Sequence, residues 1–340
     1  MAGVSETPSR TLRYKVLMVI LLGIVVGWSI LWFCAATVVE RQADRLQNAA
    51  IAQGGIVHCA NRKIAGFPFQ LDMRCHDGTR LGTEDGAVTL AGLVATTLIY
   101  RPSRIIMEAR GPATFEGDDT GTLVADWTLA HASARLDLAD AAVTRFDAEV
   151  LDGTLQAAGL PEIAFGALNL NARLNPSDAD DLDLALRVTD LDPAPSVDTT
   201  SLSMRGTLKG GASLLAGDSQ PVADMAAADG LTFTLDDAVI ESGAMQFAAT
   251  GLLTLGQDGL LDGKLDLSLA GYENDVPYVE VIAPGARETI STLLGNLLMF
   301  APETTIGERA ARRLTLQVKD GRVSAGIVPL FTVPPIALRM

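Results

Sequence analysis

The side chains best suited to chemistry gather between positions 56 and 78, which hold two of the three cysteines and two of the three histidines. These four residues are His58, Cys59, Cys75 and His76. Histidine and cysteine are the usual protein ligands of zinc, but two cysteines in an oxidising compartment can instead form a disulfide. The local secondary structure decides between a metal site and a covalent bridge.

Apolar and polar residues alternate from Phe69 to His76, which is the period of a β-strand. The segment Gly66-Phe67-Pro68 breaks the chain just before it and predicts a turn. In an antiparallel hairpin centred on Phe67, Cys59 lies opposite Cys75. Opposed Cα atoms are about 4.5–5.5 Å apart, a distance that a disulfide accepts.

The same register places His58 opposite His76. Neighbouring residues on a strand point to opposite faces, so the cysteines and the histidines cannot share one ion. We therefore predict a Cys59–Cys75 disulfide and no metal site. A bridge that closes about 16 residues contributes roughly 3 kcal/mol in the chain-entropy model.

Catalytic signatures are absent from the sequence. It contains no GxSxG, HExxH, GxxxxGK[ST] or CxxC motif, and none of the three histidines belongs to a nucleophile–base signature. Most aspartates fall at polar strand positions or in turns, where solvation explains them. The sequence predicts a protein that is not an enzyme and needs no cofactor.

These elements follow an uncharged apolar run, Val16–Val39. As a helix it would span roughly 36 Å, enough to cross the hydrocarbon core of a bilayer. Arg10, Arg13 and Lys15 precede it, and such basic flanks stay in the cytoplasm. A cleaved signal peptide has a shorter apolar core, and bulky Phe33 before Cys34 argues against a lipoprotein signal. We predict an uncleaved anchor in the bacterial inner membrane.

The anchor divides the chain into a cytoplasmic tail (1–15), a transmembrane helix (16–39), a helical stalk (40–55) and a periplasmic β-rich domain (56–340). The stalk is either a spacer or a helix resting on the domain. A loop-like stretch at 216–230 would be the boundary if the domain had two lobes. The net charge of −15 excludes nucleic acid as a partner and disfavours anionic surfaces in general.

Strand patterns dominate the domain, and two hairpins can be registered. Asp320-Gly321 is a preferred two-residue turn, which pairs Val318 with Val323, Leu316 with Ala325 and Leu314 with Ile327. A three-residue loop that ends at Gly259 pairs Leu255 with Leu261, Ala249 with Leu267 and Phe247 with Leu269. We predict a mainly β fold: a curved, mostly antiparallel sheet with one apolar face.

One amphipathic helix is predicted near the C-terminus. Its apolar face consists of Ile290, Leu293, Leu294, Leu297 and Leu298. This face either contacts lipid, as a lid over an apolar groove or as a segment at the membrane, or packs on the sheet to close the core.

A membrane helix, a polar helical stalk and the turn Gly66-Phe67-Pro68-Phe69 between two cysteines resemble a bacterial membrane-anchored family catalogued as domain of unknown function 2125. That resemblance implies a topology but no reaction. The single anchor and repetitive β-rich design are also similar to the AsmA-like envelope proteins, a likeness of architecture only.

Two classes of function follow from these patterns. The first is a membrane-anchored protein that binds or handles a lipid or another envelope amphiphile in an apolar β-groove. The alternative is a non-enzymatic periplasmic scaffold with a packed core that docks an envelope protein partner. An apolar sheet face must be covered by something, and the sequence offers few helices to cover it. We therefore favour the lipid hypothesis.

Overall fold

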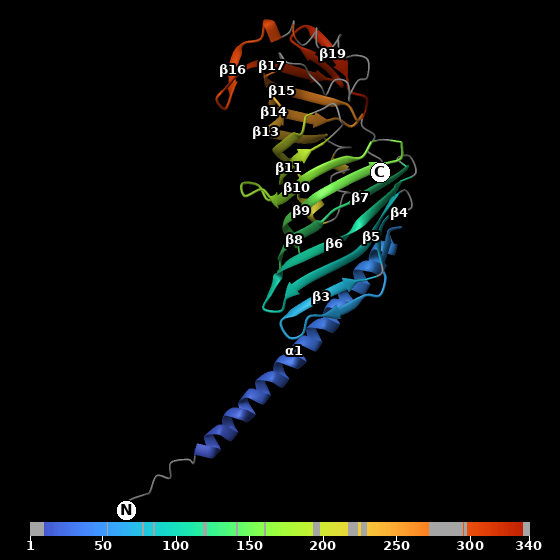
Figure 1. Ribbon diagram of the computed structural model, residues 1–340, viewed down its shortest axis with the longest axis vertical. Helices are drawn as coiled ribbons and strands as arrows, with labels where there is room; N and C mark the ends of the chain where they lie inside the picture. The colour runs from blue at the N-terminus through green and yellow to red at the C-terminus, as the bar shows by residue number, and fades with distance from the viewer. Residues whose placement is uncertain are drawn as a thin grey trace, which may run out of the picture.

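A computed structural model describes residues 10–52, 54–76, 78–83, 86–117, 121–140, 142–159, 161–192, 198–216, 224–225, 230–271, 295 and 298–335. The chain forms one long N-terminal helix, α1 (Arg10–Ala52), followed by a long, twisted, antiparallel sheet (Figure 1). One short 3-10 helix, η1 (Gly211–Ala216), interrupts the strands. The predicted mainly β fold with an N-terminal helix is confirmed.

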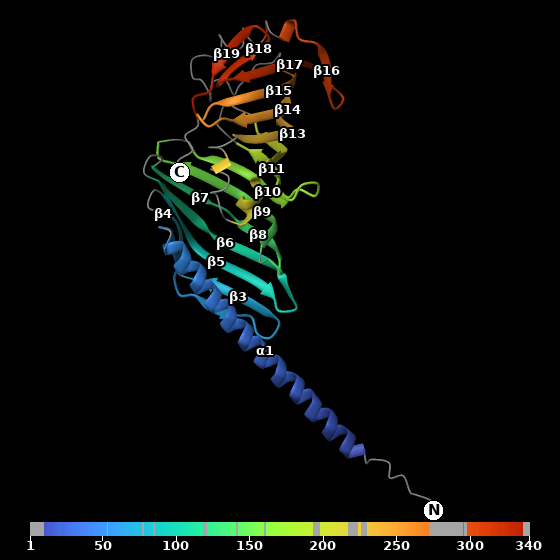
Figure 2. The same ribbon diagram turned by 180° about the vertical axis from the view of Figure 1, so that it is seen from behind.

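Helix α1 joins the apolar run and the polar stalk without a break and ends shortly before Gly54, whose φ of 80° suits glycine at a helix C-terminus. Residues 14–27 project away from the sheet, whereas the second half of the helix lies along the first strands (Figures 1 and 2). Gln47 donates to the carbonyl of Val57 (3.0 Å), and Asp44 pairs with Arg62. The stalk thus rests on the domain.

The N-terminal part of the sheet contains ten strands. They are β1 (Ile56–Cys59), β2 (Lys63–Ala65), β3 (Gln70–Cys75), β4 (Thr79–Thr83), β5 (Gly86–Leu98), β6 (Arg101–Gly117), β7 (Gly121–Asp126), β8 (Leu129–Asp137), β9 (Ala142–Ala157) and β10 (Ile163–Leu174).

The C-terminal part contains nine strands. They are β11 (Leu182–Leu191), β12 (Thr200–Leu208), β13 (Leu231–Ser242), β14 (Met245–Leu255), β15 (Leu261–Ala270), β16 (Glu303–Ile306), β17 (Arg309–Lys319), β18 (Arg322–Ala325) and β19 (Val328–Thr332).

Successive strands pair almost throughout, so the sheet is a meander. From β8 to β15 each strand pairs with the next, and β17 then pairs with β15. Strands β12 and β13, which flank the predicted boundary at 216–230, pair directly, although most of that stretch lies outside the described residues. The sheet is therefore continuous across it.

Near the helix the sheet forks. One edge of β5 pairs with β4 along its first half and with β3 along its second half. Strand β1 continues outward from β4, and β2 continues outward from β3. The β1–β4 and β2–β3 ladders therefore lie end to end along β5. A covalent bond across the junction between them would hold the two ladders together.

Both registered hairpins form. The loop ending at Gly259, whose φ is 74°, pairs Leu255 with Leu261 and Ala249 with Leu267, as predicted. Around Asp320-Gly321, Val318 pairs with Val323 and Leu316 with Ala325. The third predicted pair of that hairpin is wrong: β18 ends at Ala325, and Ile327 is 99% exposed. Leu314 pairs instead with Leu267 of β15.

Three buried apolar clusters hold the elements together. The largest joins β14, β15, β17 and β18 around Leu298, which is fully buried. A second joins α1 to β3 around Trp32, and a third packs η1 on Leu182 and Leu208. Of the predicted helix face, Ile290, Leu293, Leu294 and Leu297 lie outside the described residues, so the amphipathic helix stays a prediction.

Asp181 fastens η1 to the sheet. Its carboxylate accepts a hydrogen bond from the backbone N–H of Gly210 (2.9 Å) and pairs with Lys209 (3.0 Å), while its side chain is only 8% exposed. These two partners, the Gly210 hydrogen bond first, lower the pKa of Asp181 below its ordinary 3.8.

Asp181→Ala should therefore cost roughly 1–3 kcal/mol in the free energy of unfolding, because the Gly210 N–H loses its charged acceptor. Since the folded-state pKa is lowered, this stabilisation is complete well above pH 3.8 and is lost as the pH falls below that value. Denaturant unfolding at neutral and acidic pH would measure both effects. The exposed neighbour supplies the control: Asp180→Ala should change stability little, and equal losses from both variants would contradict this role for Asp181.

Candidate functional site

One face of the sheet carries an unbroken apolar row that runs across thirteen strands, one residue from each. The row follows directly from the strand registers, since each member lies opposite the next. In order from β2 to β17, its members are Ile64, Met73, Ala95, Met107, Ala132, Ala148, Leu170, Leu186, Met204, Ala238, Ala249, Leu267 and Leu314. At about 4.8 Å between strands, the row is roughly 55–60 Å long.

The rows on either side of this one, on the same face, are nearly as apolar. Phe146 faces Ala172, which faces Leu184, and Val150 faces Leu168, which faces Val188. Together the rows form a stripe, which we call the apolar stripe. Polar residues occupy the intervening positions, on the opposite face of the same strands, because strand side chains alternate.

The described elements cover the apolar stripe at three places only. Helix α1 covers Ile64 at one end, η1 covers Ala172 near the middle, and Leu298 covers Leu267 at the far end. Between them, Met107, Leu170, Leu186 and Met204 are half-buried, and none belongs to the three clusters that the described residues form. An apolar face of this length would ordinarily be buried under a second layer.

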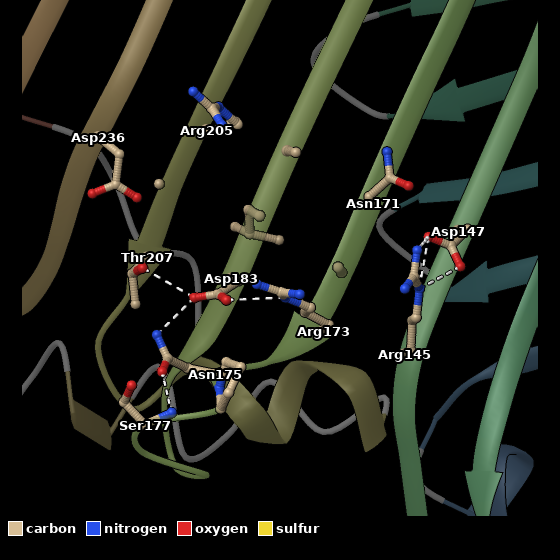
Figure 3. A pocket seen from close by; sticks show the side chains of 15 residues that line it. Arg145, Asp147, Asn171, Arg173, Asn175, Ser177, Asp183, Arg205, Thr207 and Asp236 are labelled. Atoms are coloured by element: carbon tan, nitrogen blue, oxygen red, sulfur yellow. Dashed lines mark hydrogen bonds and ion pairs between the residues drawn. The ribbon is translucent and has the colours of Figure 1, made fainter.

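The sheet bends around this stripe. Figure 3 looks onto the opposite, polar face, and there the N-terminal strands and η1 lie behind β9 and β10. In Figure 2, α1 and η1 both lie on the near side of the sheet. The apolar stripe therefore lines the concave side of the sheet, which we call the groove, and it begins where α1 meets the sheet.

The polar face carries a shallow cavity of about 660 Å³ over β9–β13 (Figure 3). Four of its charges form two ion pairs: Arg145 with Asp147 (2.8 Å) and Arg173 with Asp183 (3.1 Å). The hydrogen bonds that Arg145 donates to Asp147 raise the pKa of Arg145 above its ordinary value, so the guanidinium stays charged. The Arg173–Asp183 pair joins β10 to β11, whereas Arg145 and Asp147 both lie on β9. Neither pair offers an activated nucleophile or base.

The histidines predicted to face away from the cysteines do not gather into a site. His58 and His76 are exposed, and His131 contacts Glu149 of the adjacent strand (3.3 Å). Among the described residues, no group of three or more His, Cys, Asp or Glu side chains is arranged to hold a metal ion.

Cys59 and Cys75 form a disulfide, with Cα atoms 5.2 Å apart, while Cys34 is free and exposed. The predicted hairpin register around Phe67 is wrong, however. Ile64 pairs with Met73, and β1 leaves that hairpin to pair with β4, so that Cys59 lies opposite Thr79. The bridge joins β1 to β3 across the junction on the edge of β5. Strand β4 pairs with β5 through one edge and with β1 through the other. The spacing of residues between Cys59 and Cys75 does not reveal this partner of β1, because β4 lies outside that segment.

The predicted motif turn lies directly against α1. The Trp28 indole donates to the carbonyl of Pro68, and the Trp32 indole donates to that of Gln70, each at 2.7 Å. The ring of Phe67 packs edge-on against Trp32 (5.6 Å between centroids), and that of Phe69 lies 6.1 Å from Trp28. Gly66, with φ of 100° and the Gln70 carbonyl against it, leaves no room for a Cβ. The turn is thus the point at which the helix holds the sheet.

An antiparallel sheet carried on one apolar N-terminal helix, the only described helix long and apolar enough to span a membrane, is consistent with a membrane-anchored protein. The chain matches a bacterial family of uncharacterized proteins, DUF2125, over residues 32–334 and belongs to that family. Searches of curated proteins and of solved structures found no match, and the looser likeness to AsmA-like proteins gained no support.

Proposed function

We propose that this protein binds a lipid or another envelope amphiphile along the apolar stripe. The observation that carries the proposal is the continuity of that stripe, which crosses thirteen strands without a charged residue in its central row. Acyl chains of one leaflet span about 15 Å, half of a bilayer core, so the stripe could hold several of them end to end. Burying its half-exposed side chains against lipid would contribute about 25 cal/mol per Å².

The placement of α1 supports this proposal. The groove begins at Ile64, which packs on the same cluster as Trp32, near the end of the apolar run. An amphiphile that leaves the membrane beside α1 would meet the stripe at once. Four charged side chains of the polar-face cavity pair with one another, and no catalytic signature accompanies them, so we propose a binding role without a catalysed reaction.

We further propose that residues 1–15 are cytoplasmic and that the domain lies in the periplasm of a bacterium, anchored in the inner membrane. The basic residues before Val16 favour this orientation. The Cys59–Cys75 disulfide supports it, because such bridges persist in oxidising compartments.

Photo-crosslinking at two adjacent positions of β11 tests the binding proposal. Leu186 points into the groove and Ala185 points to the polar face, although both are half-buried. With a photoreactive amino acid at each position in turn, we expect lipid adducts from 186 and not from 185 in the full chain within its native membrane. Mass spectrometry of the cross-linked protein would identify the adducts.

A charged side chain introduced into the groove should also reduce the amount of lipid bound there. Leu186→Asp should lower the co-purified lipid at least about tenfold, a loss that needs only ~1.4 kcal/mol. Ala185→Asp, on the polar face of the same strand, should leave the lipid unchanged. Protein adducts at position 186 would favour the alternative, a scaffold whose groove receives an envelope protein. The absence of any lipid adduct there would overturn the binding proposal.

A further inference from the structure

We propose that the β2–β3 turn and the neighbouring β5–β6 turn insert into the lipid interface of the membrane leaflet on the domain's side. The domain then contacts the bilayer surface directly, in addition to being anchored by the helix. This surface, the interfacial patch, consists of Phe67, Phe69, Tyr100 and Arg101. It is distinct from the groove and can hold even if the groove binds no lipid.

The depth of the turn follows from its contacts with α1. Counting from Val16, which follows the basic flank, Trp32 and Phe33 lie about 24–26 Å along the helix axis. That distance is about 5 Å less than the roughly 30 Å thickness of the hydrocarbon core, so these residues lie just inside its far boundary. The rings of Phe67 and Phe33 stack at 6.3 Å, and Phe67 also contacts Trp32. The turn therefore lies close to the far boundary of the hydrocarbon core, beside the last part of the apolar run.

Its side chains suit that position. Phe67 is 52% exposed, Phe69 is 57% exposed and Tyr100 is 67% exposed, although aromatic side chains of that size are usually buried in a water-soluble domain. The two turns are adjacent, because the backbone N–H of Ile99 donates to the carbonyl of Phe69 (3.1 Å). Tryptophan and tyrosine favour the headgroup level, where one end of the ring is apolar and the other wet.

The charges beside the turns also favour a membrane surface. Arg101 and Arg104 are exposed at the start of β6, and Arg104 lies directly opposite Arg135 of β8. Within the described part of the chain none of these three guanidinium groups has an ion-pair partner. Like charges directly opposite each other destabilise a sheet unless a counter-ion is present. The chain as a whole carries −15, so its attraction to anionic lipid is confined to this local group of arginines. Anionic lipid headgroups supply such counter-ions at the membrane surface.

Depth measurement in liposomes tests this proposal. The full chain with Cys34→Ser keeps its disulfide, and Phe69→Cys then provides one thiol for an environment-sensitive fluorophore. The control is Phe331→Cys, since Phe331 is a comparably exposed phenylalanine (59%) in β19 at the other end of the sheet. In vesicles of phosphatidylcholine and phosphatidylglycerol, a quencher attached near the lipid headgroup should reduce the emission of label 69 at least about threefold more than that of label 331.

A second variant separates insertion from simple proximity to the helix. Arg101→Glu with Arg104→Glu, in the Phe69→Cys background, should weaken the quenching of label 69 in phosphatidylglycerol vesicles and change it little in pure phosphatidylcholine. An unchanged circular dichroism spectrum would show that the sheet remains folded. Equal quenching of labels 69 and 331 would overturn the proposal. Quenching of label 69 that ignores the charge reversal in both lipids would overturn the headgroup role of the arginines.

Discussion

Leu298→Asp is expected to unfold the C-terminal end of the sheet. Leu298 has no exposed surface, and it packs in the cluster that contains Leu267, Leu269 and Leu316. Truncating such a leucine costs about 2–5 kcal/mol, and a carboxylate without a partner adds the cost of burying a charge. We expect a loss above about 4 kcal/mol in the free energy of unfolding, measured by thermal or denaturant unfolding of the full chain.

The next residue provides a matched control. Met299 is 69% exposed, so Met299→Asp should change the stability by less than about 0.5 kcal/mol. A stable Leu298→Asp protein would show that this residue belongs to a movable lid and not to the core. Of the five residues predicted to contact lipid, only Leu298 lies within the described residues, and its surroundings favour core packing.

Loss of the disulfide should have the second-largest effect. The bridge closes a loop with a sequence separation of 16, for which the chain-entropy model gives a contribution of about 3 kcal/mol. It also holds β1 against β3 at the fork, where β4 is the only described strand that pairs with β1. Cys59→Ser with Cys75→Ser should lower the stability by that amount, and a reductant should lower the wild-type protein to the same level.

Cys34→Ser is the control, because Cys34 is free and lies in the apolar run of α1. Peptide mapping of the exported protein without reductant should show Cys59 and Cys75 joined. Thiol labelling of both residues after unfolding would contradict the bridge, and with it the main structural support for a periplasmic domain.

Sequence reasoning succeeded where the physical cause is local. The uncharged run Val16–Val39 forms a helix, as expected of a segment whose backbone polar groups would have to be satisfied internally in a membrane. The Asp320-Gly321 turn and the loop ending at Gly259 follow from the positive φ that those turns require. The Cys59–Cys75 bridge was also predicted, although from a hairpin register that does not form.

It failed where a distant segment competes for the same edge. The local pattern predicted one hairpin from Cys59 to Cys75, but β4 offered β1 an alternative partner, and Cys59 therefore lies opposite Thr79. Likewise, no local pattern requires β7 and β8 to be two separate strands. They lie side by side with β6 and β9, and each of these two long strands pairs with both in turn. The strand propensities of individual residues do not reveal which strands pair with one another.

The apolar helix, the β class, the bridge and the apolar alternation of individual strands could all be read from the order of the residues. The shared register of those strands could not, and it is this register that brings Met107, Leu170 and Met204 into a single row. The seat of the Gly66–Phe69 turn on α1 likewise appears only in the folded chain. The physical reason is that alternation sets which face a residue occupies, whereas the hydrogen-bonded ladder between distant segments sets its neighbours.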